Sequence, residues 1–158
     1  MGGRGRPGSW KDRVVFVYED DDIIVVEKPE GLAVIAPEGS RSLSLYDIVT
    51  LRIRRDNPKG RAAVVHRLDR DSSGVMVFAK HAAAKKALMD TWNELVFERR
   101  YQALVEGSFA RSEGVFDTWL AENRAGQVYT VPDGSPGAQE AVTRWKLVQA
   151  GARYSLVE

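Results

Sequence analysis

The densest group of chemically active side chains in this 158-residue sequence is the charged run at residues 66–75, HRLDRDSSGV. Five of its first six residues carry a charge or, in the case of His66, titrate near neutral pH. The run lies between two short apolar segments, residues 62–65 and 75–79, which have the length and β-branched composition of buried strands. Since the end of a buried strand seldom tolerates so many charges, we expect functional groups on a rigid support here.

The carboxylates of this run could act in two ways. Asp69 and Asp71 share a face if the run is extended, and a close carboxylate pair has one raised pKa and suits general acid–base catalysis. If the run turns, the pair diverges, and we expect Asp71 to hold the loop by accepting hydrogen bonds from backbone N–H groups. Ser72 and Ser73 are best explained as turn residues, because the sequence has no Gly-x-Ser-x-Gly elbow for a nucleophilic serine.

The run resembles the signature of the RluA-type pseudouridine synthases, which reads His-Arg-Leu-Asp, two variable residues, Thr or Ser, Ser, Gly, and Leu or a similar residue. Residues 18–32 resemble the opening hairpin of that family, with its Lys-Pro-x-Gly-Leu turn, and residues 99–107 are similar to its Lys-x-Tyr-x-Ala-x-Val-x-Gly strand. The resemblance spans roughly residues 14–158. In the family a Thr-Gly-Arg-x-His-Gln-Ile-Arg motif follows a strand like residues 153–158. We therefore expect a catalytic domain cut before its last active-site segment, and inactive in this form.

The resemblance implies an isomerase, an RNA pseudouridine synthase that converts a specific uridine of rRNA or tRNA to pseudouridine. The reaction breaks the bond from ribose C1′ to uracil N1 and joins C1′ to uracil C5. Breaking such a bond builds positive charge on the sugar. A carboxylate beside C1′ can stabilise that charge, attack as a nucleophile or take a sugar proton. The resemblance assigns this role to Asp69, with no metal and no cofactor, and leaves the three paths open.

Four further residues are candidates for binding the substrate. The target nucleotide has to leave the stack of bases, which opens a gap in the RNA. The resemblance implies that Arg67 fills this gap, because its planar guanidinium can stack on bases. Tyr101 resembles the family tyrosine that stacks on the target base. We expect Arg70 to face the RNA, whereas His66 either assists by hydrogen bonding or holds the loop. An Asp in a dry pocket needs a cation to stay charged, and the resemblance places that cation in the motif expected after the end of this sequence.

The elements that would position these residues predict an α+β fold, with a mixed, largely antiparallel sheet and flanking helices. Residues 14–18 and 23–26 are predicted to form a hairpin around an acidic turn, which we interpret as solvated rather than as a metal site. Helices are predicted over residues 44–55, with Ser44 as N-cap, and over residues 81–95. Five strand-like segments follow, at residues 101–105, 115–120, 128–131, 142–148 and 154–157.

Basic residues gather just before the charged run, at Arg52, Arg54, Arg55, Lys59 and Arg61. A solvated helix end explains this cluster about as well as a phosphate-binding patch does, and its closeness to Asp69 in sequence slightly favours RNA. The net charge does not decide between the two, because 23 Lys and Arg balance 22 Asp and Glu.

Length and composition bound the remaining possibilities. The length suits one domain, residues 14–158, after a flexible basic tail at residues 1–13. The absence of cysteine excludes disulfides and thiolate metal sites and fits the cytoplasm. No apolar run is long enough for a membrane span, and nothing indicates the oligomeric state. Two alternatives remain: a non-catalytic RNA-binding module, against which the intact Asp69 argues, and a glycosidic hydrolase, which needs a second carboxylate that only Asp71 could supply.

Overall fold

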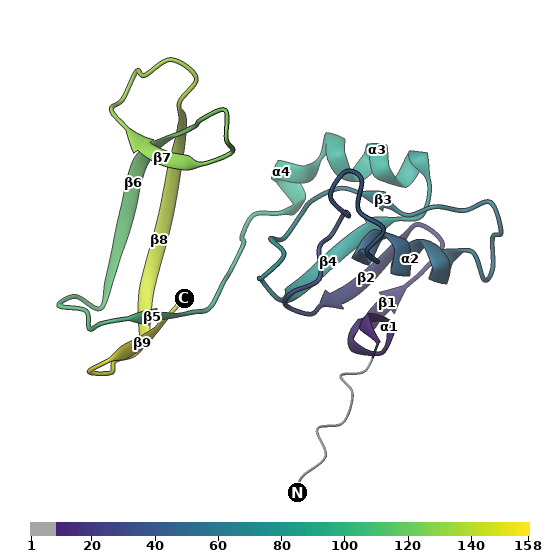
Figure 1. Cartoon of the computed structure of the whole chain (residues 1–158), viewed down its shortest axis with the longest axis horizontal. Coiled ribbons are helices and arrows are strands. Elements are labelled where there is room, and N and C mark those ends of the chain that lie inside the picture. The colour runs from purple at the N-terminus through teal and green to yellow at the C-terminus, as the bar shows by residue number, and fades with distance from the viewer. Residues whose placement is uncertain (1–8) are drawn as a thin grey trace, which may run out of the picture. The chain divides into compact units, whose positions relative to one another are not determined.

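The computed structural model describes residues 9–158 as an α+β structure in which every strand pairing is antiparallel. This confirms the predicted fold class. The chain divides between Phe97 and Glu98 into two compact units, each with its own sheet (Figure 1). The sequence predicted one mixed sheet instead, but the strands after residue 98 pair only among themselves. That the two units act as one catalytic domain stays a prediction.

The first described element is the short helix α1 (Trp10–Arg13). The sequence predicted a flexible tail over residues 1–13; its last four residues are helical instead, and residues 1–8 lie outside the described residues. The helix is held by Ser9 Oγ, which accepts from Lys11 N at 3.4 Å, and by Val14 N, which donates to Trp10 O at 3.1 Å. The Trp10 ring also packs against the hydrophobic core, a contact that the composition of a short basic stretch does not reveal.

Unit 1, up to Phe97, is built on a four-stranded sheet in the order β1-β2-β4-β3 (Figure 1). Its strands are β1 (Val15–Glu19), β2 (Ile23–Lys28), β3 (Ala63–Val64) and β4 (Gly74–Ala79). These bounds lie within two residues of the predicted strands. β2 and β4 pair from Ile23 opposite Ala79 to Lys28 opposite Gly74. The last residue of β2 therefore lies beside the first residue of β4, where the charged run ends.

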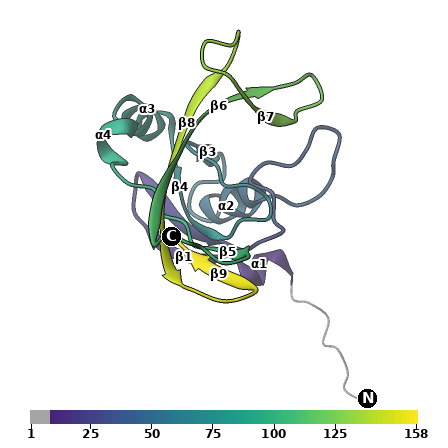
Figure 2. The ribbon, with the colours of Figure 1, turned by 90° about the vertical axis from the view of Figure 1, so that its left-hand side faces the viewer.

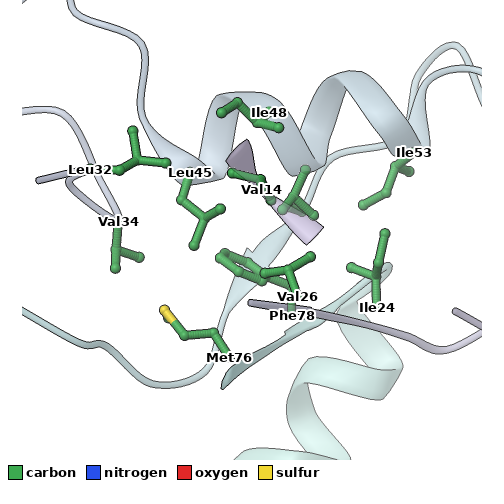
Figure 3. Packing of buried hydrophobic residues seen from close by; sticks show 12 residues of the cluster. Val14, Ile24, Val26, Leu32, Val34, Leu45, Ile48, Ile53, Met76 and Phe78 are labelled. Atoms are coloured by element: carbon green, nitrogen blue, oxygen red, sulfur yellow. The ribbon is translucent and has the colours of Figure 1, made fainter. Parts of the chain in front are cut away.

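One face of this sheet packs against helix α2 (Leu45–Ile53). The alternation along β2 turns Ile24 and Val26 inward, where they are fully buried together with Phe78 of β4 (Figure 3). Ser44 is the N-cap, as predicted, and forms a capping box with Asp47; the helix ends at Ile53, two residues before the predicted end. Each fully buried side chain of this size contributes about 1.5–3 kcal/mol, so this cluster gives unit 1 a rigid centre.

The helix predicted over residues 81–95 is interrupted. It is divided into α3 (Ala82–Asp90) and α4 (Trp92–Leu95). Thr91 leaves the helical conformation, and both its backbone N, at 3.3 Å, and its hydroxyl, at 2.9 Å, donate to Ala87 O of α3. Of the predicted apolar stripe only Ala84 is buried, whereas Leu88 and Trp92 are half-buried.

Unit 2 (Glu98–Glu158) is a five-stranded antiparallel sheet in the order β5-β9-β8-β6-β7. Its strands are β5 (Ala103–Glu106), β6 (Glu113–Glu122), β7 (Val128–Val131), β8 (Gln139–Gln149) and β9 (Tyr154–Val157). β6 and β8 form a long ribbon, with β7 at one end and β5 and β9 at the other (Figures 1 and 2). All five predicted strands are present, but the first begins after Tyr101. Ser155 is the one fully buried residue among those described in this unit.

Candidate active site

The charged run forms a loop, residues 66–73, between the neighbouring antiparallel strands β3 and β4. A turn inside this charged loop is closed by Ser72 N, which donates to Asp69 O at 3.2 Å. Gly74 then opens β4 with a φ of 146°, a conformation that favours glycine. The loop thus leaves a packed sheet and returns to it within a few residues, as the flanking apolar segments predicted.

A buried lysine joins the end of β2 to this charged loop. Lys28 is fully buried, and its Nζ donates to Leu32 O at 2.8 Å, Arg70 O at 2.9 Å and Pro29 O at 3.1 Å. Burying an ammonium group is costly unless its donors are satisfied, and here three carbonyl oxygens satisfy them. Sequence reasoning missed this role. The available signal was the inward-facing position of Lys28 on β2, two residues after the buried Val26.

The charge of Lys28 is coupled to the carboxylates of the charged loop. Burial lowers the pKa of Lys28, and the negative charges of Asp71 and, to a smaller extent, Asp69 act in the opposite direction. The ammonium group therefore lies within the field of both carboxylates. That the cation paired with Asp69 comes from a further motif of the family stays a prediction.

A second connection joins the charged loop to the turn after β2. Gly31 N donates to Arg70 O at 2.8 Å, and Arg70 Nε donates to Gly31 O at 3.2 Å. Gly31 has a φ of 78°, and a Cβ there would lie 3.2 Å from Cη2 of Trp10, so glycine suits this position. The Arg70 side chain, expected to face RNA, thus has a local partner as well. Its contact with RNA stays a prediction.

His66 is half-buried at the start of the charged loop. Its Nε2 accepts a hydrogen bond from Val77 N of β4 at 3.0 Å, so the proton of the neutral ring lies on Nδ1. The ring also lies against Trp92 of α4, with centroids 5.0 Å apart. Of the two roles left open by the sequence, this geometry favours holding the loop.

Arg67 and Asp69 are both exposed, and neither side chain makes a hydrogen bond or ion pair within residues 9–158. Both groups are therefore available to a substrate, on a loop whose backbone is held by Lys28 and Gly31. Asp71 is also exposed and accepts no hydrogen bond from the described chain. The expectation that it binds backbone N–H groups is therefore wrong; its negative charge raises the pKa of Lys28 against the effect of burial.

Tyr101 lies in unit 2 and is 55% exposed. It precedes β5 rather than lying within a strand, so its ring is not fixed by cross-strand neighbours. Its place beside Asp69 stays a prediction. Within residues 9–158 no group of three His, Asp or Glu side chains could hold a metal ion. None of the described helices is long and apolar enough to cross a bilayer.

Comparisons with known proteins agree with the motifs. The profile of the RNA pseudouridylate synthase family matches residues 22–158. The chain is 31% identical over 145 residues to an uncharacterised RNA pseudouridine synthase of Bacillus subtilis, covering 90% of this chain and 47% of that protein. It is 34% identical over 146 residues to the ribosomal large subunit pseudouridine synthase C of Vibrio vulnificus, covering 91% and 44%.

A solved structure shares the fold. The chain superposes on human RNA pseudouridylate synthase domain containing 4 with a TM-score of 0.69 at 23% identity, covering 90% of this chain and 57% of the human one. The chain spans about half the length of the curated relatives it matches.

Proposed function

The chain belongs to the RNA pseudouridylate synthase family, and we propose that the protein isomerises a specific uridine of rRNA or tRNA to pseudouridine, with Asp69 as its catalytic residue. The observation that carries this proposal is an exposed carboxylate without a hydrogen-bond partner in the described chain, on a loop whose Arg70 O accepts from both Lys28 Nζ and Gly31 N. A catalytic group has to stay accessible while its backbone is fixed. The charged loop meets both conditions, and its RNA substrate would be met in the cytoplasm.

The proposed reaction rearranges one base without adding or removing atoms. The C1′–N1 bond of uridine breaks, the uracil turns in the pocket, and C1′ bonds to C5. The hydrogen on C5 is then lost and N1 gains one, so the product is an isomer of the substrate. Asp69 would lie beside C1′, where it stabilises the developing positive charge, bonds to C1′ or takes a sugar proton. None of these paths requires a metal or a cofactor.

The neighbours of Asp69 have distinct proposed roles. Arg67 would occupy the gap left by the extruded nucleotide, because its guanidinium is exposed and has no partner in the described chain. Tyr101 would stack on the target base. His66 would hold the start of the loop through Val77 N. Lys28 would keep the loop in place through its hydrogen bond to Arg70 O.

The test uses the full-length protein with Asp69→Asn, which keeps the size of the side chain and removes its charge. We expect pseudouridine formation in rRNA and tRNA to fall ~10²–10³-fold or more, the usual cost of losing one such transition-state group. RNA affinity should remain within a few fold, because Asp69 contributes no positive charge to phosphate binding. Pseudouridine is measured by mass spectrometry of digested RNA.

Three outcomes would contradict parts of the proposal. Activity within about tenfold of the wild type would remove Asp69 from the catalytic role. Release of free uracil would indicate a glycosidic hydrolase rather than an isomerase. Wild-type protein that binds RNA but forms no pseudouridine in any RNA would favour a non-catalytic binding module.

A further inference from the structure

We propose that the turn between α2 and β3, residues 54–61, binds the phosphate backbone of the RNA that carries the target uridine. This inference rests on the proposed function, because that function supplies the RNA. The segment, called the basic turn below, has one carboxylate, Asp56, and four cations: Arg54, Arg55, Lys59 and Arg61. Apart from Gly60, its residues are exposed.

The basic turn is held in one conformation. Asn57 N donates to Ile53 O at 3.0 Å, and Gly60 N donates to Asn57 O at 2.8 Å. Gly60 is buried, and a Cβ there would lie 2.6 Å from Ile53 Cγ2, so no other residue fits without a shift. Arg54 Nε then donates to Gly60 O at 3.2 Å, which fixes that guanidinium across the turn. A solvated loop does not require such order, whereas a preorganised binding surface loses less entropy on binding.

The cations of the basic turn make no ion pair within the described residues, although Arg54 Nε donates to Gly60 O. Elsewhere in unit 1 positive side chains do have acidic partners. Glu19 forms ion pairs with Arg52 at 2.9 Å and with Lys80 at 3.0 Å. Across residues 9–158, no ion pair involves Arg54, Arg55, Lys59 or Arg61. Four close positive charges with one nearby carboxylate repel one another, and an anionic partner would relieve that repulsion.

The dipole of helix α2 explains only some of the positive charges in the basic turn. The negative end of the α2 dipole favours cations at Arg54 and Arg55, which follow the last helical residue. Lys59 and Arg61 lie beyond the last turn, where this effect has faded. Arginine pairs with phosphate through two parallel hydrogen bonds, so the basic turn has the side chains that an RNA backbone requires.

The basic turn and the charged loop lie on the same rigid unit. Ala63 of β3 pairs with Ala79, so the basic turn lies toward that end of β4, whereas the charged loop joins β4 at Gly74. Five residue steps along β4 separate these ends by about 17 Å. The basic turn would therefore contact phosphates a few nucleotides from the uridine at Asp69. Phosphate contacts position an RNA without selecting its sequence.

The experiment compares two variants that each remove two exposed positive charges from unit 1. The first is Arg55→Gln/Lys59→Gln in the basic turn. The matched control is Lys85→Gln/Lys86→Gln on α3. The affinity of the full-length protein for a uridine oligonucleotide of about twenty residues is measured over a range of KCl concentrations. We expect the slope of log K against log salt to become less steep by about 1.4 in the first variant, at about 0.7 per lost phosphate contact. The control should keep the wild-type slope.

Activity separates this inference from the proposed function. At saturating RNA the basic-turn variant should keep the wild-type kcat and show a raised KM, whereas Asp69→Asn lowers kcat. An unchanged salt slope in the basic-turn variant, or an equal change in the control, would overturn the inference. A larger loss of affinity for polyglutamate than for RNA would assign the surface to an acidic protein and would also overturn it. RNA binding through the basic turn by a protein that forms no pseudouridine would support this inference and contradict the proposed function.

Discussion

The two units of this chain stabilise their sheets in different ways. In unit 1, Phe78 is fully buried at the centre of a cluster formed by the sheet and α2. In unit 2, Phe116 is 57% exposed and Tyr129 is 50% exposed, and the strands are joined mainly by the backbone ladder between β6 and β8. The charged loop lies on the unit that has a core. A catalytic carboxylate has to be held within about half an ångström, and only packed neighbours supply such a support.

The largest effect is expected from removing the centre of the core. Phe78→Ala should lower the free energy of unfolding by about 3–5 kcal/mol, because it leaves a cavity among fully buried side chains. The matched substitution Phe116→Ala in unit 2 should cost less than about 1 kcal/mol. Urea unfolding, followed by tryptophan fluorescence, measures both. Similar losses of unfolding free energy in the two variants would show that the two units are stabilised in the same way.

Lys28→Met should have the next largest effect. The substitution keeps an unbranched side chain but leaves Pro29 O and Leu32 O without their donor, whereas Arg70 O keeps the bond from Gly31 N. We expect a loss of about 3 kcal/mol, since each buried acceptor left unsatisfied costs about 1–3 kcal/mol and local shifts recover part of the sum. Hydrogen exchange at Gly31 N, which donates to Arg70 O, should become faster. The exposed Lys85→Met on α3 is the control, and an equal loss there would remove Lys28 as a support of the charged loop.

Gly31→Ala should lower the free energy of unfolding by a moderate amount. The same substitution at Gly134 serves as its control. Both Gly31 and Gly134 have a positive φ, 78° and 76°, so an alanine at either position is strained by about 1–2 kcal/mol. A Cβ at Gly31 also meets Trp10, whereas nothing lies within 4 Å at Gly134. Gly31→Ala should therefore be the more destabilising substitution, and adding Trp10→Ala should remove the excess. Equal effects of the two alanines would show that α1 does not press on this turn.

The smallest effect is a dependence of stability on alkaline pH. Burial lowers the pKa of Lys28 in the folded protein below the ordinary value of 10.5. Between these two pKa values the unfolded chain binds more protons than the folded one, so the stability of the wild type should rise with pH through that window. Lys28→Met should lack this rise, which thermal unfolding of both proteins at several pH values would detect. If the stability of the wild type and that of Lys28→Met depend on pH in the same way, burial does not lower the pKa of Lys28.

The sequence predicted the parts of the site that depend on local pattern. Alternating apolar residues located the strands around the charged loop, and the resemblance to the family signature assigned the catalytic role to Asp69, which stays a prediction. The alternation along β2 could have indicated that Lys28 faces inward, but not that it binds Arg70 O, because that contact is long-range. Strand patterns also do not reveal pairing partners, so the two separate sheets were missed. The break at Thr91, whose hydroxyl bonds to Ala87 O, is not visible in the helical periodicity of residues 81–95.

The contact between Lys28 Nζ and Arg70 O joins residues 42 positions apart. The ends of so long a segment are brought together only when β2 and β4 have paired, because closing a loop of this length costs entropy before any contact repays it. We expect the contact of Lys28 with Arg70 O to form after this pairing, so weakening that contact should leave the folding rate almost unchanged and accelerate unfolding. The loop that carries Asp69 would then be the last part of unit 1 to become ordered and the first to open.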